Sequence, residues 1–352
     1  MGYFVGVDVG GTTSTVTIGN DARDVVHVTE QFETNAAKGP QASIAAIVEH
    51  VLAGVQTIGG EPHEIVSVGL STPGPATFDG ILLKTPNLNP EFWDRYPIRQ
   101  ELEKAFRAQS LGLSVHYIGD GQAAALGEFA VRKGVVQWSR RAEVRSQANL
   151  SSLFMVIVGT GLGGGEVRDG RVVRGLEGRA GHAGHILLPE YAFRYEHDRQ
   201  LQVGNAYCTV ESAVSLTGLA HQLGYRLTLD TWKNHPLNQQ DGTNKDKAKQ
   251  LRKLADGGDA LALELFDDQA RALGIALLSI NYLGDYDLLV IGGGVCDLST
   301  NVRDRYRKIA EDTYRQYALD GFRNLAGFEF SACGDEAPVI GALVHAYEAV
   351  TS

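Results

Sequence analysis

Apolar and polar residues follow two different periods along the chain. Near its start, Val16 and Ile18 alternate with threonines after the apolar run 3–7, which predicts a strand, a tight turn and a second strand. Residues 41–53 instead place apolar side chains three and four positions apart, which predicts an amphipathic helix. The same patterns predict further strands at 65–71, 81–83, 115–118, 153–158 and 287–291, and further helices at 99–107, 210–223, 259–283, 303–317 and 338–350.

Two long polar segments interrupt this pattern, at 133–152 and 228–249. Both are interpreted as solvated surface insertions. Arg140, Arg141 and Arg145 in the first segment leave a phosphate-binding or partner-binding patch as a second interpretation.

Glycines follow three of the predicted buried strands: Gly10 and Gly11, the run 159–165, and Gly292, Gly293 and Gly294. The first two glycine turns each join one strand to another, and the second is followed by a further Asp169-Gly170 turn. This weak internal repeat suggests two lobes of similar topology.

Asp8 ends the first predicted strand, and Gly10, Gly11, Thr12 and Thr13 follow after Val9. Glycines permit positive φ and close approach to the backbone, and the threonines and free N–H groups of the turn are donors for phosphate oxygens. A carboxylate at this place suits a hydrated Mg²⁺ ion. An ordinary hairpin turn explains the same residues equally well.

The segment 159–164 matches G-x-G-x-x-G, which is typical of dinucleotide-binding proteins when a helix follows. A strand and the Asp169-Gly170 turn follow here, so the sequence disfavours a dehydrogenase. Gly159, Thr160 and Gly161 are expected to hold phosphate, and a purely structural glycine turn is the alternative.

Composition narrows the class of protein. The chain has 352 residues, a net charge of −10 and 43% hydrophobic residues, which is typical of a globular protein of about two domains. The acidic balance argues against nucleic-acid binding. No apolar run reaches membrane-spanning length, and no signal peptide is evident, so a cytoplasmic location is expected. The three cysteines are too few and too scattered for a disulfide framework.

In order and spacing, these motifs resemble the actin-like ATPase fold and, within it, the ROK family of sugar kinases and repressors. The resemblance covers nearly the whole chain, through the segments 8–12, 73–75, 86–88, 119–124, 158–161, 180–185, 211–215, 291–294, 334–335 and 340–342. It implies a two-lobed α/β (ribonuclease H-like) protein. Its small lobe would span 1–118, completed by a C-terminal helix at 336–352, and its large lobe 119–335.

The resemblance further implies ATP and Mg²⁺ as cofactors, a hexose as substrate and a homodimer. Asp120 would be the catalytic base that takes the proton of the sugar 6-hydroxyl, and Gly292–294 would face the adenosine. Sequence alone leaves a simpler role open, because Asp120 stands at the N-cap position of a predicted helix. Asn87, His182, His185 and Glu211 would contact the sugar, although each histidine could be purely structural.

Three departures from the family pattern bear on these roles. Gly119 replaces the family's asparagine before the catalytic aspartate, which could cost about 1–3 kcal/mol of sugar binding or change the sugar that fits. His182 replaces a glutamate. The cysteine-rich zinc loop is missing, because 203–208 keeps only Cys208. Structural zinc wants four ligands, and His185 and Cys208 would need His182 or His197 to complete a set, so we do not expect zinc.

These departures keep a second hypothesis open, a sugar-binding sensor with weak catalysis. Direct DNA repression is not expected, because Asp8 leaves no room for a preceding helix-turn-helix. The sequence does not select among glucose, N-acetylated hexosamines, mannose and fructose, nor between ATP and polyphosphate as donor.

Overall fold

The computed structural model describes residues 2–83, 88–138, 147–325 and 327–351. It divides into two compact units, one of residues 1–153, 165–181 and 332–352, the other of residues 154–164 and 182–331. We call them unit 1 and unit 2. The predicted lobes at 1–118 and 119–335 use another boundary, and they remain a prediction.

Unit 1 is built on a sheet of strand order β3-β2-β1-β5-β6, with β4 pairing β2. Its strands are β1 (Tyr3–Val9), β2 (Thr13–Asn20), β3 (Val25–Val28), β4 (Phe32–Glu33), β5 (Ile65–Thr72) and β6 (Val115–Gly119). β1 pairs antiparallel with β2 and parallel with β5, and β5 pairs parallel with β6. The first predicted strand–turn–strand element is therefore confirmed.

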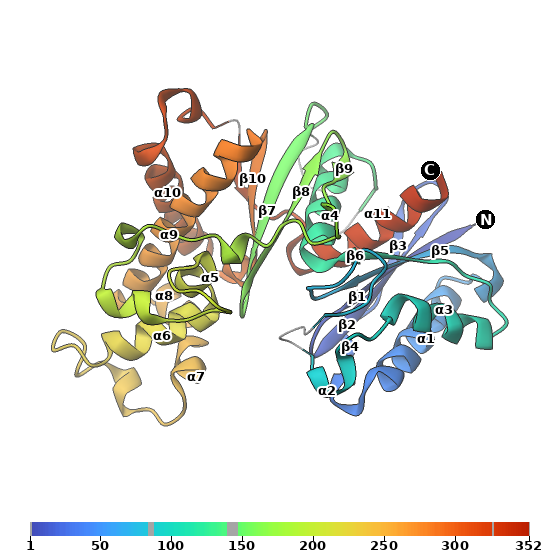
Figure 1. Cartoon of the computed structure of the whole chain (residues 1–352), viewed down its shortest axis with the longest axis horizontal. Helices are drawn as coiled ribbons and strands as arrows, with labels where there is room; N and C mark the ends of the chain where they lie inside the picture. The colour runs from blue at the N-terminus through green and yellow to red at the C-terminus, as the bar shows by residue number, and fades with distance from the viewer. Residues whose placement is uncertain (1, 84–87, 139–146, 326, 352) are drawn as a thin grey trace. The chain divides into compact units, whose positions relative to one another are not determined.

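Helices cover both faces of this sheet (Figure 1). They are α1 (Pro40–Thr57), α2 (Pro90–Trp93), α3 (Ile98–Ala108), α4 (Asp120–Lys133) and α11 (Ala337–Thr351). Val5 and Val7 are fully buried in the cluster that also contains Ile47 of α1. On the opposite face, α11 packs closely against Gly6 and Gly69. A side chain at Gly6 would prevent this packing, because its Cβ would lie 2.4 Å from the carbonyl oxygen of Val339.

The second sheet has the order β11-β10-β7-β8-β9. Its strands are β7 (Ser152–Val158), β8 (Leu162–Arg168), β9 (Arg171–Val172), β10 (Leu288–Gly293) and β11 (Phe328–Phe330). Read from β3 in the first sheet and from β9 in the second, the strand orders match: β3-β2-β1-β5-β6 and β9-β8-β7-β10-β11. The internal repeat predicted from the glycine turns is therefore confirmed in the topology.

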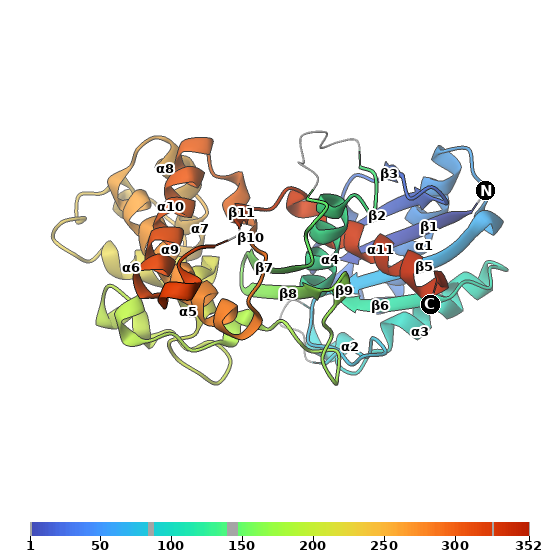
Figure 2. The ribbon, with the colours of Figure 1, turned by 90° about the horizontal axis from the view of Figure 1, so that it is seen from above.

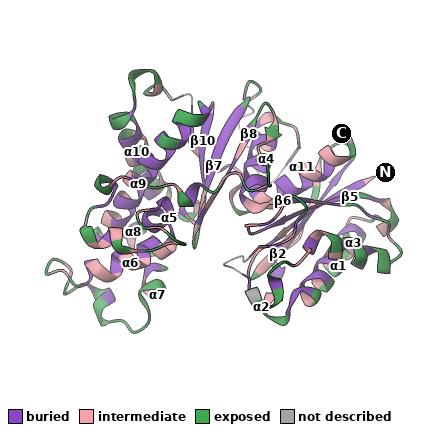
Figure 3. Cartoon of the chain, viewed as in Figure 1, coloured by how far each residue is buried: buried purple, intermediate pink, exposed green. Residues whose placement is uncertain are grey.

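The helices of unit 2 are α5 (Val210–Val214), α6 (Leu216–Arg226), α7 (Asn244–Ala248), α8 (Leu251–Asp256), α9 (Ala260–Gly284) and α10 (Thr300–Tyr317). α9 and α10 lie side by side in both ribbon views (Figures 1 and 2). Most residues of α9 are buried, and β7 and β10 are almost wholly buried (Figure 3). None of the described helices is long and apolar enough to span a membrane.

Several elements differ from the sequence prediction. The helix predicted at 210–223 is two helices, because Ser215 has extended backbone and its hydroxyl caps the second helix at Gly218 N. The strand predicted at 81–83 is reduced to isolated bridges of Ile81 and Leu82. Pro338 is the second rather than the first residue of the terminal helix.

The two polar segments are not purely solvated. The segment 228–249 contains a 3-10 turn, helix α7 and the buried side chains of Leu237 and Ala248. In the segment 133–152, Trp138 and Leu150 are buried, while the predicted arginine cluster at 140–145 lies outside the described residues.

Candidate active site

Three parallel strands of unit 1 end at the same edge of the sheet. Asp8 at the end of β1 is in register with Ser71 of β5, and Ser71 with Ile118 of β6. Asp120 follows β6 directly. Ligands of open α/β sheets bind at the carboxyl ends of the strands, so the chain places two carboxylates where such a site is expected.

Asp8 is partly buried and accepts a hydrogen bond from the Ser71 hydroxyl, 2.8 Å from its Oδ1. Burial raises the pKa of Asp8 to about 7, and the negative charge of Asp120 adds to the rise, against the hydrogen bond from Ser71. A buried carboxylate beside a second carboxylate is costly when ionised, unless a cation or a proton compensates for its charge.

Asp120 is the first residue of α4, and Gly119 is the N-cap, so the N-cap position predicted for Asp120 is wrong by one residue. Gly119 has extended backbone and is the last residue of β6, and the helix starts at Asp120. Oδ1 of Asp120 accepts a hydrogen bond from the N–H of Gly121 at 2.7 Å. The positive end of the helix dipole favours the ionised carboxylate at this position.

The first glycine turn is held closed by its own backbone and by one threonine. Gly10 N–H donates to the carbonyl oxygen of Thr13 at 2.9 Å, and Thr34 donates its hydroxyl to the carbonyl oxygen of Gly10 at 2.9 Å. Gly10 does not use the positive φ that glycine permits. Glycine is needed there because a Cβ would lie 2.5 Å from the Thr13 oxygen. The Thr12 side chain is exposed next to Gly11.

The second glycine turn lies in unit 2, where the start of α6 holds it. The carbonyl oxygen of Gly159 accepts from the N–H of Leu216 at 2.9 Å, and that of Thr160 accepts from the Thr217 hydroxyl at 2.8 Å. Strand β8 follows Gly161 directly, as the sequence predicted, so the helix that a dinucleotide-binding motif requires is not there.

Glu211 braces the same turn from the other side. Its Oε2 accepts from the N–H of Leu162 at 2.7 Å, and a Cβ on Gly161 would lie 2.7 Å from that oxygen. The carboxylate also approaches Gly184, next to His185, because a Cβ on Gly184 would lie 3.2 Å from Oε2. The residue predicted to bind sugar therefore links the turn to the histidine segment.

The third glycine segment closes against β7. A Cβ on Gly293 would lie 2.4 Å from the carbonyl oxygen of Val158, and Gly293 has a φ of 81°. A Cβ on Gly292 would meet the Met155 side chain at 2.3 Å. Side chains are thus excluded at the two positions that bring β10 close to the second glycine turn.

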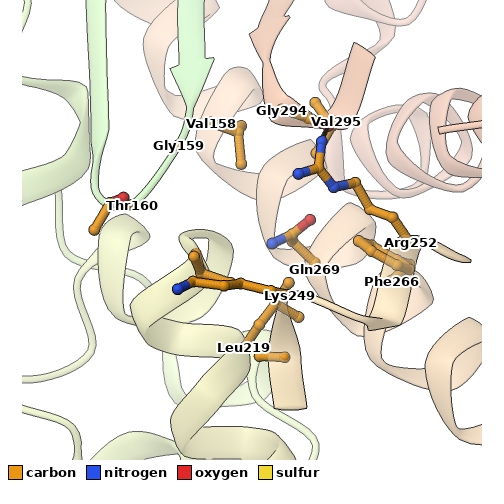
Figure 4. A pocket seen from close by; sticks show the side chains of 12 residues that line it. Val158, Gly159, Thr160, Leu219, Lys249, Arg252, Phe266, Gln269, Gly294 and Val295 are labelled. Atoms are coloured by element: carbon orange, nitrogen blue, oxygen red, sulfur yellow. Dashed lines mark hydrogen bonds between the residues drawn. The ribbon is translucent and has the colours of Figure 1, made fainter. Parts of the chain in front are cut away.

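A pocket of about 210 Å³ lies where the second and third glycine segments meet (Figure 4). Its lining residues are Val158, Gly159, Thr160, Leu216, Leu219, Ala248, Lys249, Arg252, Phe266, Gln269, Gly294 and Val295. Gly159, Thr160 and Gly294 thus line one pocket within unit 2. Apolar walls with a few polar groups are typical of a site for a planar base.

The sequence analysis missed the helical side of this pocket. Lys249 and Arg252 lie at its rim, at the end of the segment interpreted as a polar insertion. Arg252 pairs with Asp297 and donates to the carbonyl oxygen of Gly294 at 3.1 Å, while Lys249 lies 3.5 Å from Asp246. The partners of Arg252 come from a distant segment and leave no local signal in the sequence, whereas Asp246 is only three residues from Lys249.

The two predicted sugar-binding histidines are exposed and lie near each other, with ring centroids 6.3 Å apart. Cys208 donates weakly to the carbonyl of Arg199, and His197 stacks on His221 instead. Among the residues that the structure describes, no three metal-ligating side chains gather into a metal site. The expectation about zinc rests on the sequence alone.

Gly119 leaves open the space where the family has an asparagine side chain. A Cβ at Gly119 would lie 3.7 Å from Oε1 of Gln122, at ordinary contact distance. Gln122 is buried, its amide donates to the carbonyls of Gly178 and Ala180, and its Oε1 has no partner. This acceptor was missed in the sequence. Asn87, the remaining predicted sugar contact, lies outside the described residues.

Comparison with known proteins places this geometry in a family. The family model for ROK proteins matches residues 4–349. A glucokinase of Halalkalibacterium halodurans is 28% identical, over 96% of this chain and 93% of its own length. The ROK hexokinase of Thermus thermophilus is 26% identical with a TM-score of 0.74, covering 99% of each chain.

A ROK glucokinase of Streptomyces griseus, solved with glucose and AMPPNP, superposes with a TM-score of 0.73 over 99% of this chain and all of its own, at 23% identity. The structural matches confirm the predicted α/β fold of the actin-like ATPase type, and the family model spans nearly all of the sequence. The chain belongs to the ROK family.

Proposed function

We propose that this protein transfers the γ-phosphoryl group of ATP to the 6-hydroxyl of a glucose-like hexose. Glucokinases and a hexokinase among its relatives support the reaction. The observation that carries it is the pairing of Asp8 and Asp120 at the ends of parallel strands in unit 1. Phosphoryl transfer asks mainly for positioning and charge compensation, and these two carboxylates provide the groups for both.

The residues of unit 1 fit a magnesium ion. Asp8 is a partly buried carboxylate whose pKa is raised, and Mg²⁺ in phosphoryl-transfer sites takes one or two carboxylates together with water and phosphate oxygens. Asp8 would hold the hydrated ion, while Thr12, Thr13 and the backbone of Gly10 and Gly11 meet phosphate oxygens. When bound, the ion neutralises the charge on the transferring phosphate.

Asp120 would act as the general base. Its carboxylate stands at the start of α4, where the positive end of the helix dipole favours the ionised form that accepts the hydroxyl proton of the sugar. The hydrogen bond from Gly121 N–H to Oδ1 orients the side chain.

Glu211, His182 and His185 would supply contacts to the sugar, together with Asn87. Glu211 would have two tasks, since Oε2 already braces Leu162 while a carboxylate has further lone pairs for sugar hydroxyls. The pocket lined by Gly159, Thr160 and Gly294 would take the nucleotide. A homodimer, which the family resemblance implies, and a cytoplasmic location, which the sequence predicts, are also part of the proposal.

A sugar sensor with weak catalysis is the second candidate, and Gly119 is the observation that favours it. The missing asparagine would remove a contact to the sugar beside the base, where the buried Oε1 of Gln122 has no hydrogen-bond partner. Polyphosphate is the alternative to ATP as phosphate donor.

The test is a coupled assay of ADP release with Mg²⁺-ATP and a panel of glucose, mannose, fructose, N-acetylglucosamine and N-acetylmannosamine. We expect release that depends on one or two of these sugars. Calorimetric binding of a sugar without ADP release would favour the sensor. Formation of sugar phosphate with polyphosphate but not with ATP would make polyphosphate the donor.

A further inference from the structure

The pocket of unit 2 contains one buried polar side chain whose hydrogen bonding is incomplete, that of Gln269 in α9. Gln269 is 1% exposed and lines the pocket together with Phe266 one turn earlier on the same helix. In Figure 4 its amide lies between Lys249 and Arg252, with the oxygen drawn on the side of Arg252. A polar group at the bottom of a largely apolar pocket is suited to orient a ligand.

The orientation of this amide follows from its neighbour. Its Nε2 donates to the carbonyl oxygen of Val214. Because a carbonyl oxygen only accepts, the NH₂ end must face Val214 and the oxygen must face away from it. That oxygen, Oε1, is buried and has no hydrogen-bond partner. Buried acceptors are nearly always paired, so this one calls for a donor.

The cations of the pocket are already engaged. Arg252 donates to the Gly294 carbonyl and pairs with Asp297, and Lys249 lies beside Asp246. The missing donor is therefore best supplied by a ligand that enters the pocket. Since the second glycine turn at Gly159 and Thr160 forms one wall, that ligand is the base of the nucleotide whose phosphates the turn would hold.

We propose that Gln269 selects the base by accepting a hydrogen bond from the exocyclic amino group of adenine. Guanine and hypoxanthine carry an acceptor oxygen at the same ring position, which would face Oε1 without a proton between them. A site built to pair with an N–H group rejects analogues that lack it, because its own buried group is then left unpaired. The inference rests on the proposed use of ATP and extends it to base selection.

The test compares ATP with purine riboside triphosphate, which lacks only the amino group. Wild-type kcat/KM should fall roughly tenfold or more with the analogue, and GTP should be poorer still. Gln269→Met keeps the shape of the side chain without the acceptor. This variant should use ATP and the analogue within about twofold of each other, through a higher KM for ATP and an unchanged kcat.

Gln222→Met is the matched control. Gln222 in α6 is 3% exposed, donates to the Ala213 carbonyl at 3.1 Å and also has an unpaired Oε1, but it does not line the pocket. It should lose a similar amount of thermal stability and keep the wild-type preference for ATP over the analogue. A control that loses the preference equally would overturn the assignment to Gln269.

The comparison of ATP with the analogue on wild-type protein decides the matter even if Gln269→Met does not fold. Equal use of both nucleotides would refute base selection and leave the kinase proposal intact. A wild-type protein that neither binds nor turns over ATP, in titration calorimetry and the coupled assay, would remove both.

Discussion

The first and second glycine turns occupy matching places in sheets of matching strand order, yet different side chains surround them. The first follows a strand whose second-last residue is Asp8, whereas the second follows a strand that ends in Val158. The first is closed by the Thr34 hydroxyl, the second by the start of α6 and by Glu211. One backbone pattern thus carries a carboxylate in unit 1 and borders an apolar pocket in unit 2.

This difference shows that a repeated turn does not fix which groups stand beside it. The carboxylates of unit 1 suit a cation and a base, while the apolar walls of unit 2 suit a nucleoside. Unit 1 therefore offers the carboxylates that unit 2 lacks, and unit 2 offers the apolar pocket. Each of the four substitutions below changes one feature of one unit.

The largest effect is expected from Asp120→Asn. The amide keeps the size of the side chain and accepts from Gly121 N–H, but it does not take a proton from the sugar. We expect kcat to fall by about 10²–10⁴-fold, with sugar binding in calorimetry changed less than about threefold. Turnover at the wild-type rate would remove Asp120 from the role of base.

Gly161→Ala tests the packing of the second turn. The added Cβ would lie 2.7 Å from Glu211 Oε2, so the turn or the carboxylate must move. We expect the KM for ATP to rise by roughly tenfold or more. Gly163→Ala is the matched control in β8, since nothing lies within 4 Å of a Cβ there, and it should leave the KM unchanged. Equal KM changes in both variants would mean that the bracing by Glu211 is irrelevant.

Asp8→Asn tests the charge at the first turn through the pH dependence of stability. Because the pKa of Asp8 is raised to about 7, the folded protein holds a proton that the unfolded chain has lost above pH about 4. Wild-type stability from this group is present at low pH and is lost as the pH rises from about 4 to about 7. The variant has no such loss, so relative to wild type it should gain about 1–3 kcal/mol between pH 4.5 and pH 8.

The measurement is urea unfolding of both proteins at the two pH values without nucleotide. A stability difference that does not change with pH would show that Asp8 ionises normally. Saturating Mg²⁺-ATP should reduce the stability difference between wild type and variant at pH 8. The bound cation would compensate for the Asp8 charge of the wild-type protein, which the variant lacks.

The smallest effect is expected from Gly119→Asn, which restores the family side chain. The space beside Gln122 accepts a Cβ at 3.7 Å, so folding should be unaffected. A new amide contact to the sugar should change the ratio of kcat/KM between hexoses by up to about tenfold. Gly119→Ala adds the Cβ without the amide and should keep the wild-type ratio. An unchanged ratio in the asparagine variant would exclude this position from sugar selection.

Much of the fold could be predicted because its signals are local. Alternation at Val16 and Ile18 and the helical spacing at 41–53 identify their elements, and the glycine turns identify the repeat. The break at Ser215 had a signal that was overlooked, since a serine before Leu216 is a strong N-cap residue. The registers that bring Asp8 beside Ser71 are not local, so the sequence alone did not reveal this hydrogen bond.

The candidate site was predicted only in part, because some of its residues have local signals in the sequence and others do not. Asp8 and Asp120 end strands and are visible as motifs. Thr34, Gln122 and Gln269 act through hydrogen bonds to distant backbone, and nothing in their neighbouring residues distinguishes them from ordinary polar positions.

The central claim is that one phosphoryl group passes from ATP to a sugar hydroxyl. Phosphorus NMR of the wild-type protein with Mg²⁺-ATP and the sugar selected by the hexose panel follows that group directly. The account predicts a growing hexose 6-phosphate resonance that matches the ADP formed. Inorganic phosphate in its place, or an ATP spectrum that does not change while the sugar binds, would contradict it.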